Sequence, residues 1–539
     1  MNAIDELRYM NLQELYEKMQ HSNQEFDDWI KPWQCRMQKK ILGGGSNDFV
    51  HIDNPHWTKN QKLNNAHLGF YVPFRTKMVP IFTFLFLTFC GSIYGGVDQR
   101  VDVTTTRGDI FGYHVDFGSD KNVLFYGEAD VFLGLPFVVP PVGPRRFQVE
   151  ALKFIQQEIA NFGGDPYRIT LFGNSAGAAS IDAHTYSPLS QHLFQQAILQ
   201  SGTVFLTFDG ALGFSENSFT NAEKLCNYTK SMWNTHNYTD LKSCLQDMDY
   251  TLFLQQDSGD AFGWKMTQDN YFIPDVPKNL YKNRPNIPKI VGNVKDEWSL
   301  FDLLLLMAGI SIDFYSKSWF ESELRLFGSF LGNNTDIVQN IMENAYVPPG
   351  TNDTDHLAWL QITSDIFTPI IWTGFAGRDV EFNLLQNNSN VFLYEFTWPT
   401  AIGKTFWVPG WNPVFHTSEL PIEWVGPDAW QKAIANGNVT STDMEIMNAF
   451  GEYWTNFAKY GVPTLNNTWG PVTQNNWEYY ELGKTQGMRQ NYRVADRLLW
   501  NKVLPAILGD LPPEMPDYNN GTTILAKLLK NALLLQTNA

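Results

Sequence analysis

The chain of 539 residues contains 39 Lys and Arg against 56 Asp and Glu, which gives a formal net charge of -17 at pH 7. Such an acidic surface repels the phosphates of nucleic acids and anionic lipids, which argues against a nucleic-acid-binding role. Apolar residues make up 43% of the chain and charged residues 18%, which rules out global disorder. The four cysteines cannot form a disulfide scaffold and lie in no zinc-like cluster, so we expect no metal and no cofactor.

The first 77 residues show little apolar periodicity and contain a segment rich in Asn, His and Lys. We expect an extension here and not a domain. Residues 78–96 have the order of a secretory signal peptide, with basic residues before Met78, an apolar run ending at Cys90, and small residues after it. A buried strand is the alternative interpretation of this run. The run is too short to cross a bilayer as a helix, so we expect no integral membrane span.

Asn-x-Ser/Thr sequons occur only after this signal-like segment, and they serve only chains that enter the secretory pathway. Cys226 and Cys244 are the only cysteines in the same part of the chain, and a bond between them would add about 3 kcal/mol of stability. The sequence therefore predicts a secreted, glycosylated protein that begins near Met78. The predicted acceptors are Asn227, Asn237, Asn333, Asn352, Asn387, Asn438, Asn466 and Asn520.

Strand patterns follow the signal-like segment. Alternating residues at 101–105 and 122–126, followed by a Pro-rich segment, predict a β-meander. Apolar residues at 152–162 then fall on one helical face, and a Gly-Gly-Asp-Pro turn ends that helix before a short β-rich run at 168–172. This helix, turn and strand order is typical of an α/β fold.

Strands and helices continue to alternate toward the C-terminus. Strands are predicted at 289–294 and 390–396, and a long helix at 444–459. Residues 97–510 are therefore expected to form one α/β domain. The tail at 511–539 contains an amphipathic helix that carries too many lysines for a membrane anchor.

A Gly-x-Ser-x-Gly sequence with Ser175 at its centre directly follows the strand predicted at 168–172. A serine on such a tight strand-to-helix turn needs glycine on both sides, and the turn raises its Oγ to the N-terminus of the next helix. The pentapeptide by itself is a weak signal, and the strand before it and the small residues after it strengthen the case. We predict Ser175 as a nucleophile.

A serine nucleophile needs a base and an acid, and in α/β-hydrolases the chain order is serine, acid, histidine. His416 stands in a Gly/Pro-rich loop, where a scaffold can place a general base. Asp296 or Glu297 is a candidate acid, because both follow the strand predicted at 289–294 and active sites gather at such strand ends. The other histidines have less suitable positions, either too close to Ser175, beside sequons or in a helical pattern: His184, His192, His236 and His356.

These motifs resemble the type B carboxylesterases of the cholinesterase-like family over roughly residues 100–505. The resemblance implies an α/β-hydrolase fold and a serine esterase that hydrolyses a small-molecule carboxylic ester through an acyl-enzyme intermediate. The segments that carry it are 132–136, 140–147, 161–166, 173–180, 197–202, 292–297, 416–421 and 454–459.

The family's mechanism transfers to matching positions of this sequence. The resemblance implies that Ser175 is the nucleophile, that His416 is the general base and acid, and that Glu297 orients the imidazole. It also implies that the backbone N–H of Ala176 is one oxyanion donor. Cys226 and Cys244 match a disulfide of the family.

The chain departs from the family between Phe147 and Gln148, which are adjacent in this sequence. The family has about one hundred residues there, with several strands and the glycine-rich turn that supplies further oxyanion donors. The sequence therefore predicts an incomplete central sheet and weak catalysis, since each lost oxyanion donor costs about 10²–10³ in rate. The alternative function is that of a non-catalytic cholinesterase-like protein, secreted or at the cell surface, that serves adhesion.

Overall fold

The part of the chain that the computed structural model describes comprises residues 97–120, 126–132, 150–205, 217–235, 237–249, 251–252, 266, 272–328, 335–423 and 427–508. The predicted extension at 1–77, the signal-like segment at 78–96 and the tail at 511–539 lie outside these residues. The interpretations of those three segments stay predictions.

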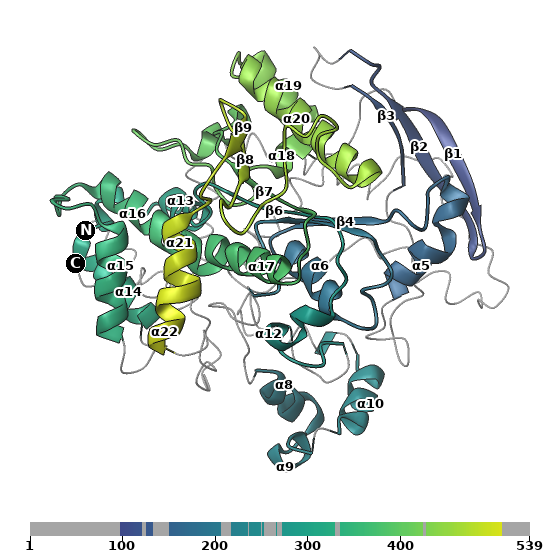
Figure 1. Cartoon of the computed structure of the whole chain (residues 1–539), viewed down its shortest axis with the longest axis horizontal. Helices are drawn as coiled ribbons and strands as arrows, with labels where there is room; N and C mark the ends of the chain where they lie inside the picture. Colours follow the sequence, from purple (N-terminus) through teal and green to yellow (C-terminus); the bar gives the residue numbers. More distant parts are fainter. Residues whose placement is uncertain are drawn as a thin grey trace.

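A six-stranded sheet forms the centre of the molecule (Figure 1). The strands lie next to one another in chain order; the first five are parallel, and the last is antiparallel to its neighbour. Parallel neighbours require crossover connections, which helices supply here, and this architecture confirms the predicted α/β class. The strands are β4 (Thr170–Asn174), β5 (Gln196–Gln200), β6 (Lys289–Val294), β7 (Val391–Phe396), β8 (Tyr479–Leu482) and β9 (Gly487–Arg489).

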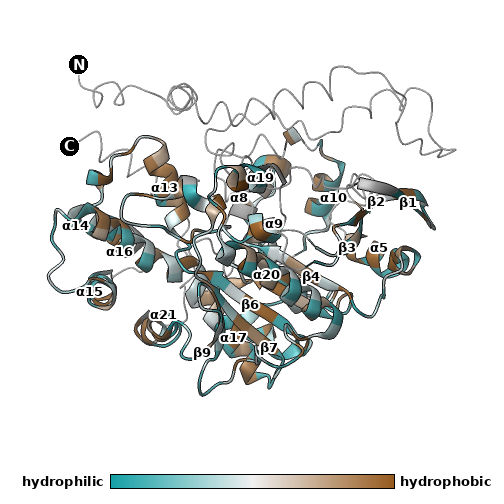
Figure 2. Cartoon of the chain, turned by 90° about the horizontal axis from the view of Figure 1, so that it is seen from above, coloured by the Kyte–Doolittle hydropathy of each residue, from teal (hydrophilic) through white to brown (hydrophobic). Residues whose placement is uncertain are grey.

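The central strands β5 to β7 are buried on both faces, and their apolar side chains point alternately up and down. Ile198 of β5 packs into the cluster under helix α20 (Ser441–Tyr460), whereas its neighbour Leu199 packs with residues of α6 (Ala176–Tyr186) and α17 (Gly374–Leu385). Figure 2 shows hydrophobic positions along the strands and mixed colours on the outer helices. The core therefore lies between the sheet and one layer of helices on each side.

Helix α20 begins three residues before the predicted start at 444. Thr440 accepts a hydrogen bond from the backbone N–H of Asp443 at 3.2 Å, and the Asp443 carboxylate accepts one from the Thr440 backbone at 2.8 Å. This reciprocal capping satisfies two backbone donors that a helix start leaves open. The cap rather than the apolar pattern thus determines where the helix starts.

A separate antiparallel sheet precedes the central one (Figure 1). It contains β1 (Val97–Thr105), β2 (Gly108–Asp116) and β3 (Glu128–Val131). The predicted meander is present, but its second strand is β2, which the sequence analysis missed because its buried positions, such as Val115, do not alternate strictly. The strand predicted at 122–126 lies almost entirely outside the described residues.

A small helical subcluster carries the predicted disulfide. Cys226 at the end of α8 (Asn217–Cys226) is bonded to Cys244 in α10 (Thr239–Asp247). None of the described helices is long and apolar enough to cross a membrane. The remaining α-helices are α5 (Glu150–Glu158), α9 (Lys230–Trp233), α12 (Pro277–Leu280), α13 (Ser299–Met307), α14 (Lys317–Gly328), α15 (Thr335–Tyr346), α16 (His356–Thr368), α18 (Leu420–Glu423), α19 (Pro427–Ala435), α21 (Val494–Leu498) and α22 (Leu504–Leu508).

Candidate active site

Ser175 occupies the sharp turn between β4 and α6. Its backbone has φ 58° and ψ -121°, a conformation that residues with a side chain rarely adopt. Two hydrogen bonds hold the turn: Ser175 N–H donates to the carbonyl of Gln200 at 2.8 Å, and Ala179 N–H donates to the carbonyl of Ser175 at 3.0 Å. Strained backbone of this kind concentrates at active sites, and here it forms the tight strand-to-helix turn that the sequence predicted.

Close backbone packing explains two of the glycines around this elbow. A Cβ on Gly173 would lie 2.9 Å from the carbonyl carbon of Gly177, and a Cβ on Gly202 would lie 2.3 Å from the carbonyl oxygen of Ser175. A Cβ on Gly177 would meet nothing within 4 Å. Gly202 is thus as necessary to the turn as Gly173, although it lies one strand further along the chain.

We expect Gly202→Ala to destabilise the protein by about 1–3 kcal/mol, because the new methyl group must displace the Ser175 carbonyl. The matched control is Gly177→Ala, which adds the same methyl group in open space at a helical position and should be neutral or stabilising by about 0.5–1 kcal/mol. Urea unfolding followed by circular dichroism measures both. Equal stabilities of the two variants would contradict this explanation of the elbow.

The structure brings together His416 and Glu297, which are far apart in the sequence. Imidazole Nδ1 of His416 lies 2.6 Å from Oε2 of Glu297, and both side chains are buried. A carboxylate can only accept this hydrogen bond, so Nδ1 carries the proton and Nε2 is left as the basic nitrogen. The other oxygen of Glu297 accepts hydrogen bonds at 3.0 Å from Asn293 and from the backbone of Val294.

Asp296, the other candidate acid, has a different position. Its backbone N–H donates to the carbonyl of Val414 at 3.0 Å, and its carboxylate accepts a hydrogen bond from Val414 N–H at 2.9 Å. It therefore fixes the loop that carries His416 against the end of β6. Of the two candidate acids, Glu297 is thus the one that contacts the imidazole.

An aromatic side chain that the sequence analysis missed lies against the imidazole. The rings of Trp372 and His416 have their centroids 4.8 Å apart and are tilted by 41°. Trp372 belongs to a π-helical segment, Pro369–Thr373, that interrupts the helical run between α16 and α17. π-Helical turns are frequent at functional sites, and this one places an indole ring against the imidazole. Pro369 within a helical pattern is the sequence signal that could have pointed to this segment.

Two further buried carboxyl groups lie beside the elbow. Glu419 accepts a hydrogen bond from the amide of Asn174 at 2.9 Å, and burial together with the negative charge of Glu297 raises its pKa to about 8. Glu423 accepts one from Gln200 at 2.5 Å, and burial raises its pKa well above the ordinary value, with a contribution from Glu419. At neutral pH Glu419 is therefore mostly protonated.

Ala176, the predicted oxyanion donor, is the first residue of α6 and is exposed, as is Gly177. The N-terminus of a helix directs unpaired N–H groups and a partial positive charge outward, so the Ala176 N–H is suitably placed for an anion. Ser175 itself is half-buried. The elbow is thus open to solvent on the side of Ala176.

The other histidines have no contact with this site in the described part of the chain. His184 pairs with the hydroxyl of Ser190 at 2.8 Å, and His356 opens α16 with its ring 2.8 Å from the carbonyl of Tyr315. His192 is exposed, and His236 lies outside the described residues. Similarly, no group of three or more His, Cys, Asp or Glu side chains among the described residues could hold a metal ion.

Most of the predicted glycosylation acceptors lie at the surface. Asn438 is half-buried, and its side-chain oxygen accepts a hydrogen bond from Lys404 at 2.9 Å. Asn333 and Asn520 lie outside the described residues. The exposed acceptors are Asn227, Asn237, Asn352, Asn387 and Asn466.

The chain is similar in sequence to several known proteins. The chain is 27% identical over 519 residues to the acetylcholinesterase of Bungarus fasciatus, with 89% of this chain and 80% of that protein covered. It is 26% identical to the acylcarnitine hydrolase of Rattus norvegicus over 68% of this chain and 62% of that protein. It is 25% identical to neuroligin-2 of Rattus norvegicus over 66% of this chain and 44% of that protein. The chain thus spans less than two thirds of the length of the last two.

The model of the carboxylesterase family matches residues 148–500, more than half of the chain. The match begins at the residue where the sequence departs from the family and includes β4 to β9. It confirms the resemblance that the sequence motifs indicated and the α/β-hydrolase fold that the family implies. The chain belongs to the carboxylesterase family.

Proposed function

We propose that the chain carries the catalytic groups of a serine hydrolase that acts on carboxylic esters, within one domain at residues 97–510. In this proposal Nε2 of His416 accepts the proton of Ser175 Oγ as that oxygen attacks the ester carbonyl, while Glu297 stabilises the imidazolium. The alcohol leaves with that proton, and water then hydrolyses the acyl-enzyme by the same steps. The hydrogen bond of 2.6 Å between His416 and Glu297 beside a strained serine elbow is the observation that carries the proposal.

The oxyanion that forms in each step needs hydrogen-bond donors, and Ala176 N–H is the donor that we propose for it. The sequence lacks the family's glycine-rich turn, which would supply others. We therefore propose that the chain forms an acyl-enzyme but turns over slowly. Its substrate is a small carboxylic ester, and no cofactor takes part.

A fluorophosphonate probe tests the nucleophile, because it reacts covalently with a serine that a neighbouring base activates. We expect the probe to label the wild-type chain slowly and Ser175→Ala not at all. The matched control is Ser180→Ala, which removes an exposed hydroxyl that donates to the Ala176 carbonyl at 2.7 Å one helical turn away. The probe should label this control variant at the wild-type rate. Labelling that persists in Ser175→Ala would disprove the assignment.

A second candidate function is that of a non-catalytic, cholinesterase-like protein that serves adhesion outside the cell. The similarity to neuroligin-2 and the missing glycine-rich turn favour it. A folded chain that no fluorophosphonate labels, even at high probe concentration, would support this candidate over the esterase.

We also propose that the protein enters the secretory pathway, which the exposed sequons and the bond between Cys226 and Cys244 support. Translation from Met78 should give a secreted, glycosylated product, because the apolar run then stands at the N-terminus. Translation from Met1 should give poor export. Comparing medium with lysate, before and after enzymatic glycan removal, measures both. Cytosolic, unglycosylated product from the Met78 version would refute the proposal.

A further inference from the structure

The loop that carries His416 and the elbow that carries Ser175 are connected by one buried side chain, Glu419. Glu419 follows His416 by three residues and is fully buried. Its Oε1 accepts a hydrogen bond from the amide of Asn174 at 2.9 Å and a longer one from the hydroxyl of Ser201 at 3.4 Å. Asn174 directly precedes Ser175, and Ser201 follows the residue whose carbonyl accepts the backbone N–H of Ser175. Glu419 thus bridges the segments of the proposed base and the proposed nucleophile.

Each of the three segments that this bridge joins contains a residue with an unfavourable backbone conformation. The φ angle is 58° at Ser175, 52° at Ser201 and 74° at Thr417, which lies two residues before Glu419. Residues with a side chain seldom adopt positive φ, and such conformations persist only where the surrounding structure holds them. Glu419 belongs to one of these segments and is hydrogen-bonded to the other two, so it is suited to hold them together.

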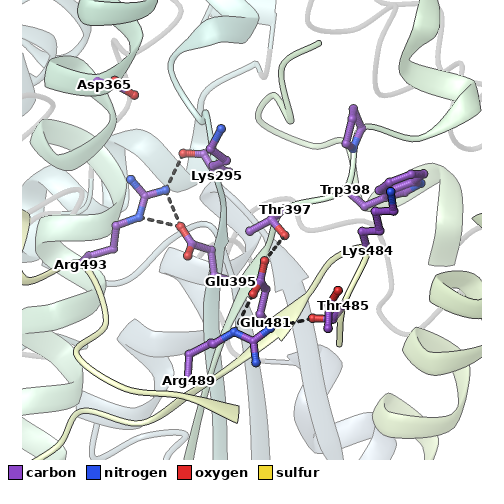
Figure 3. Close-up of a pocket in the computed structure, with 11 residues that line it drawn as sticks. Lys295, Asp365, Glu395, Thr397, Trp398, Glu481, Lys484, Thr485, Arg489 and Arg493 are labelled. Atoms are coloured by element: carbon purple, nitrogen blue, oxygen red, sulfur yellow. Dashed lines mark hydrogen bonds and ion pairs between the residues drawn. The ribbon is translucent and has the colours of Figure 1, made fainter. Parts of the chain in front are cut away.

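Glu419 lacks the cationic partner that other carboxylates of this protein have. At the carboxyl end of β7, for example, Glu395 lies 2.6 Å from Arg493, and Figure 3 shows this pair. No Lys or Arg in the described part of the chain forms an ion pair with Glu419. A fully buried carboxylate without a cation is unfavourable, so burial favours the protonated form of this side chain.

The ionisable groups that face Glu419 come from three other elements: Glu297 after β6, Tyr394 in β7 and Glu423 in α18. Burial and the negative charge of Glu297 raise the pKa of Glu419 to about 8, whereas the hydrogen bonds that it accepts lower it. Burial also raises the pKa of Glu423 and of Tyr394 well above their ordinary values. A protonated carboxyl group still accepts hydrogen bonds at one oxygen, so Glu419 can join two segments without a charge that would repel Glu297.

We propose that Glu419 is a positioning residue, whose neutral carboxyl group joins the loop of His416 to the elbow of Ser175 and so sets the distance between base and nucleophile. This inference deepens the proposed hydrolase function and rests on it. The hydrogen bonds of Glu419 lead to Asn174 and Ser201, so it acts on the reaction through them. Because a misplacement of about 1 Å can reduce a reaction rate about 10²-fold, such a bridge affects catalysis.

Fluorophosphonate labelling of the full chain measures this effect. Glu419→Ala should lower the maximal rate of labelling by about 10- to 100-fold and leave the half-saturating probe concentration nearly unchanged, because the bridge positions the reacting groups and does not bind the probe. Glu419→Gln should recover most of this rate, because its amide oxygen can accept the same hydrogen bonds. The matched control is Glu445→Ala, which removes an exposed carboxylate from α20 and should be labelled at the wild-type rate.

A double-mutant cycle tests the contact between Glu419 and Asn174. Asn174→Ala and Glu419→Ala are made singly and together, and labelling rates and urea unfolding midpoints are measured for all four chains. If the two side chains act through one bridge, the double variant should lose about as much rate and stability as Glu419→Ala alone. If Glu419→Ala does not fold, Asn174→Ala must still slow labelling for the proposal to stand.

Urea unfolding at several pH values tests the neutral form of Glu419. A carboxyl group whose pKa is raised in the folded state makes the protein less stable as the pH rises from the group's ordinary pKa of 4.5 to its folded pKa of about 8. Glu419→Gln does not titrate, so its unfolding midpoint should rise relative to that of the wild type over this range and change no further above it. A constant difference between the two chains would refute the neutral form.

These readouts separate the bridge from the hydrolase function. A folded wild-type chain that the probe does not label would refute the hydrolase function, and the urea midpoints of the double-mutant cycle would then decide whether the bridge exists. Equal labelling rates of Glu419→Ala and the wild type, no recovery in Glu419→Gln, or independent losses in the cycle would each overturn the positioning role.

Discussion

Inserting a relative's glycine-rich stretch between Phe147 and Gln148 should raise the hydrolysis of p-nitrophenyl acetate by about 10²–10³ for each oxyanion donor that the insert supplies. The physical reason is that the other parts of the proposed machinery are already in place. Ser175 is held at its elbow, His416 is hydrogen-bonded to Glu297, and Ala176, the residue after Ser175, is exposed. What the sequence lacks is the glycine-rich turn that would supply further donors to the developing oxyanion.

The insert should come from the acetylcholinesterase of Bungarus fasciatus, because its similarity to this chain extends over 519 residues and so covers both sides of the junction. Three initial rates are compared: the original chain, the completed chain and the completed chain with Ser175→Ala. The serine variant should lose the gain in rate, which shows that the insert assists Ser175 and does not hydrolyse the ester itself. An insert of equal length made of Gly and Ser is the second control. A folded, completed chain with an unchanged rate would contradict the proposed role of the missing stretch.

Replacing Lys289 with Met should destabilise the protein by about 3–5 kcal/mol, the largest effect on stability that we expect of a single substitution. Lys289 begins β6, and its ammonium lies 3.0 Å from Asp182 and 3.6 Å from Asp379. Arg284 lies 2.5 Å from Asp379, and all four side chains are fully buried. Removing one cation leaves two fully buried carboxylates to share the other, and an uncompensated buried charge is costly.

Urea unfolding of Lys289→Met measures this loss. The matched control is Lys317→Met, which removes an ammonium that lies 3.9 Å from Glu321 and is half exposed. A surface pair of this kind contributes about 0–1 kcal/mol, so the control should unfold near the wild-type midpoint. Similar losses in both variants would mean that the buried network does not depend on Lys289.

The sequence predicted features that depend on neighbouring residues and missed those that depend on packing. The strand at 289–294 was predicted with its observed bounds, because an apolar run there is flanked by turn residues. The first strand of the sheet was placed at 168–172 but spans Thr170–Asn174, since the turn at Asp165 extends further than its pattern indicates. Strand ends of this kind depend on contacts with the neighbouring strand.

In the candidate site, too, features marked by neighbouring residues could be predicted and features that depend on packing could not. Ser175 and His416 could be predicted as candidates because glycines and prolines around them mark turns in the sequence. Asp296 and Glu297 could not be separated from the residues alone, since the choice depends on which one faces a loop more than one hundred residues away. Trp372 and the buried Glu423 were missed because only the fold brings them to His416 and to Gln200.

The exposure of Ala176 and Gly177 also affects which molecules could reach the serine. Enzymes that enclose a substrate select it by size and shape, because a group that does not fit their pocket is excluded. An elbow that is open to solvent on one side cannot exclude large groups in this way. Its preference among esters would follow their intrinsic reactivity, so that bulky and compact esters with the same leaving group would react at similar rates.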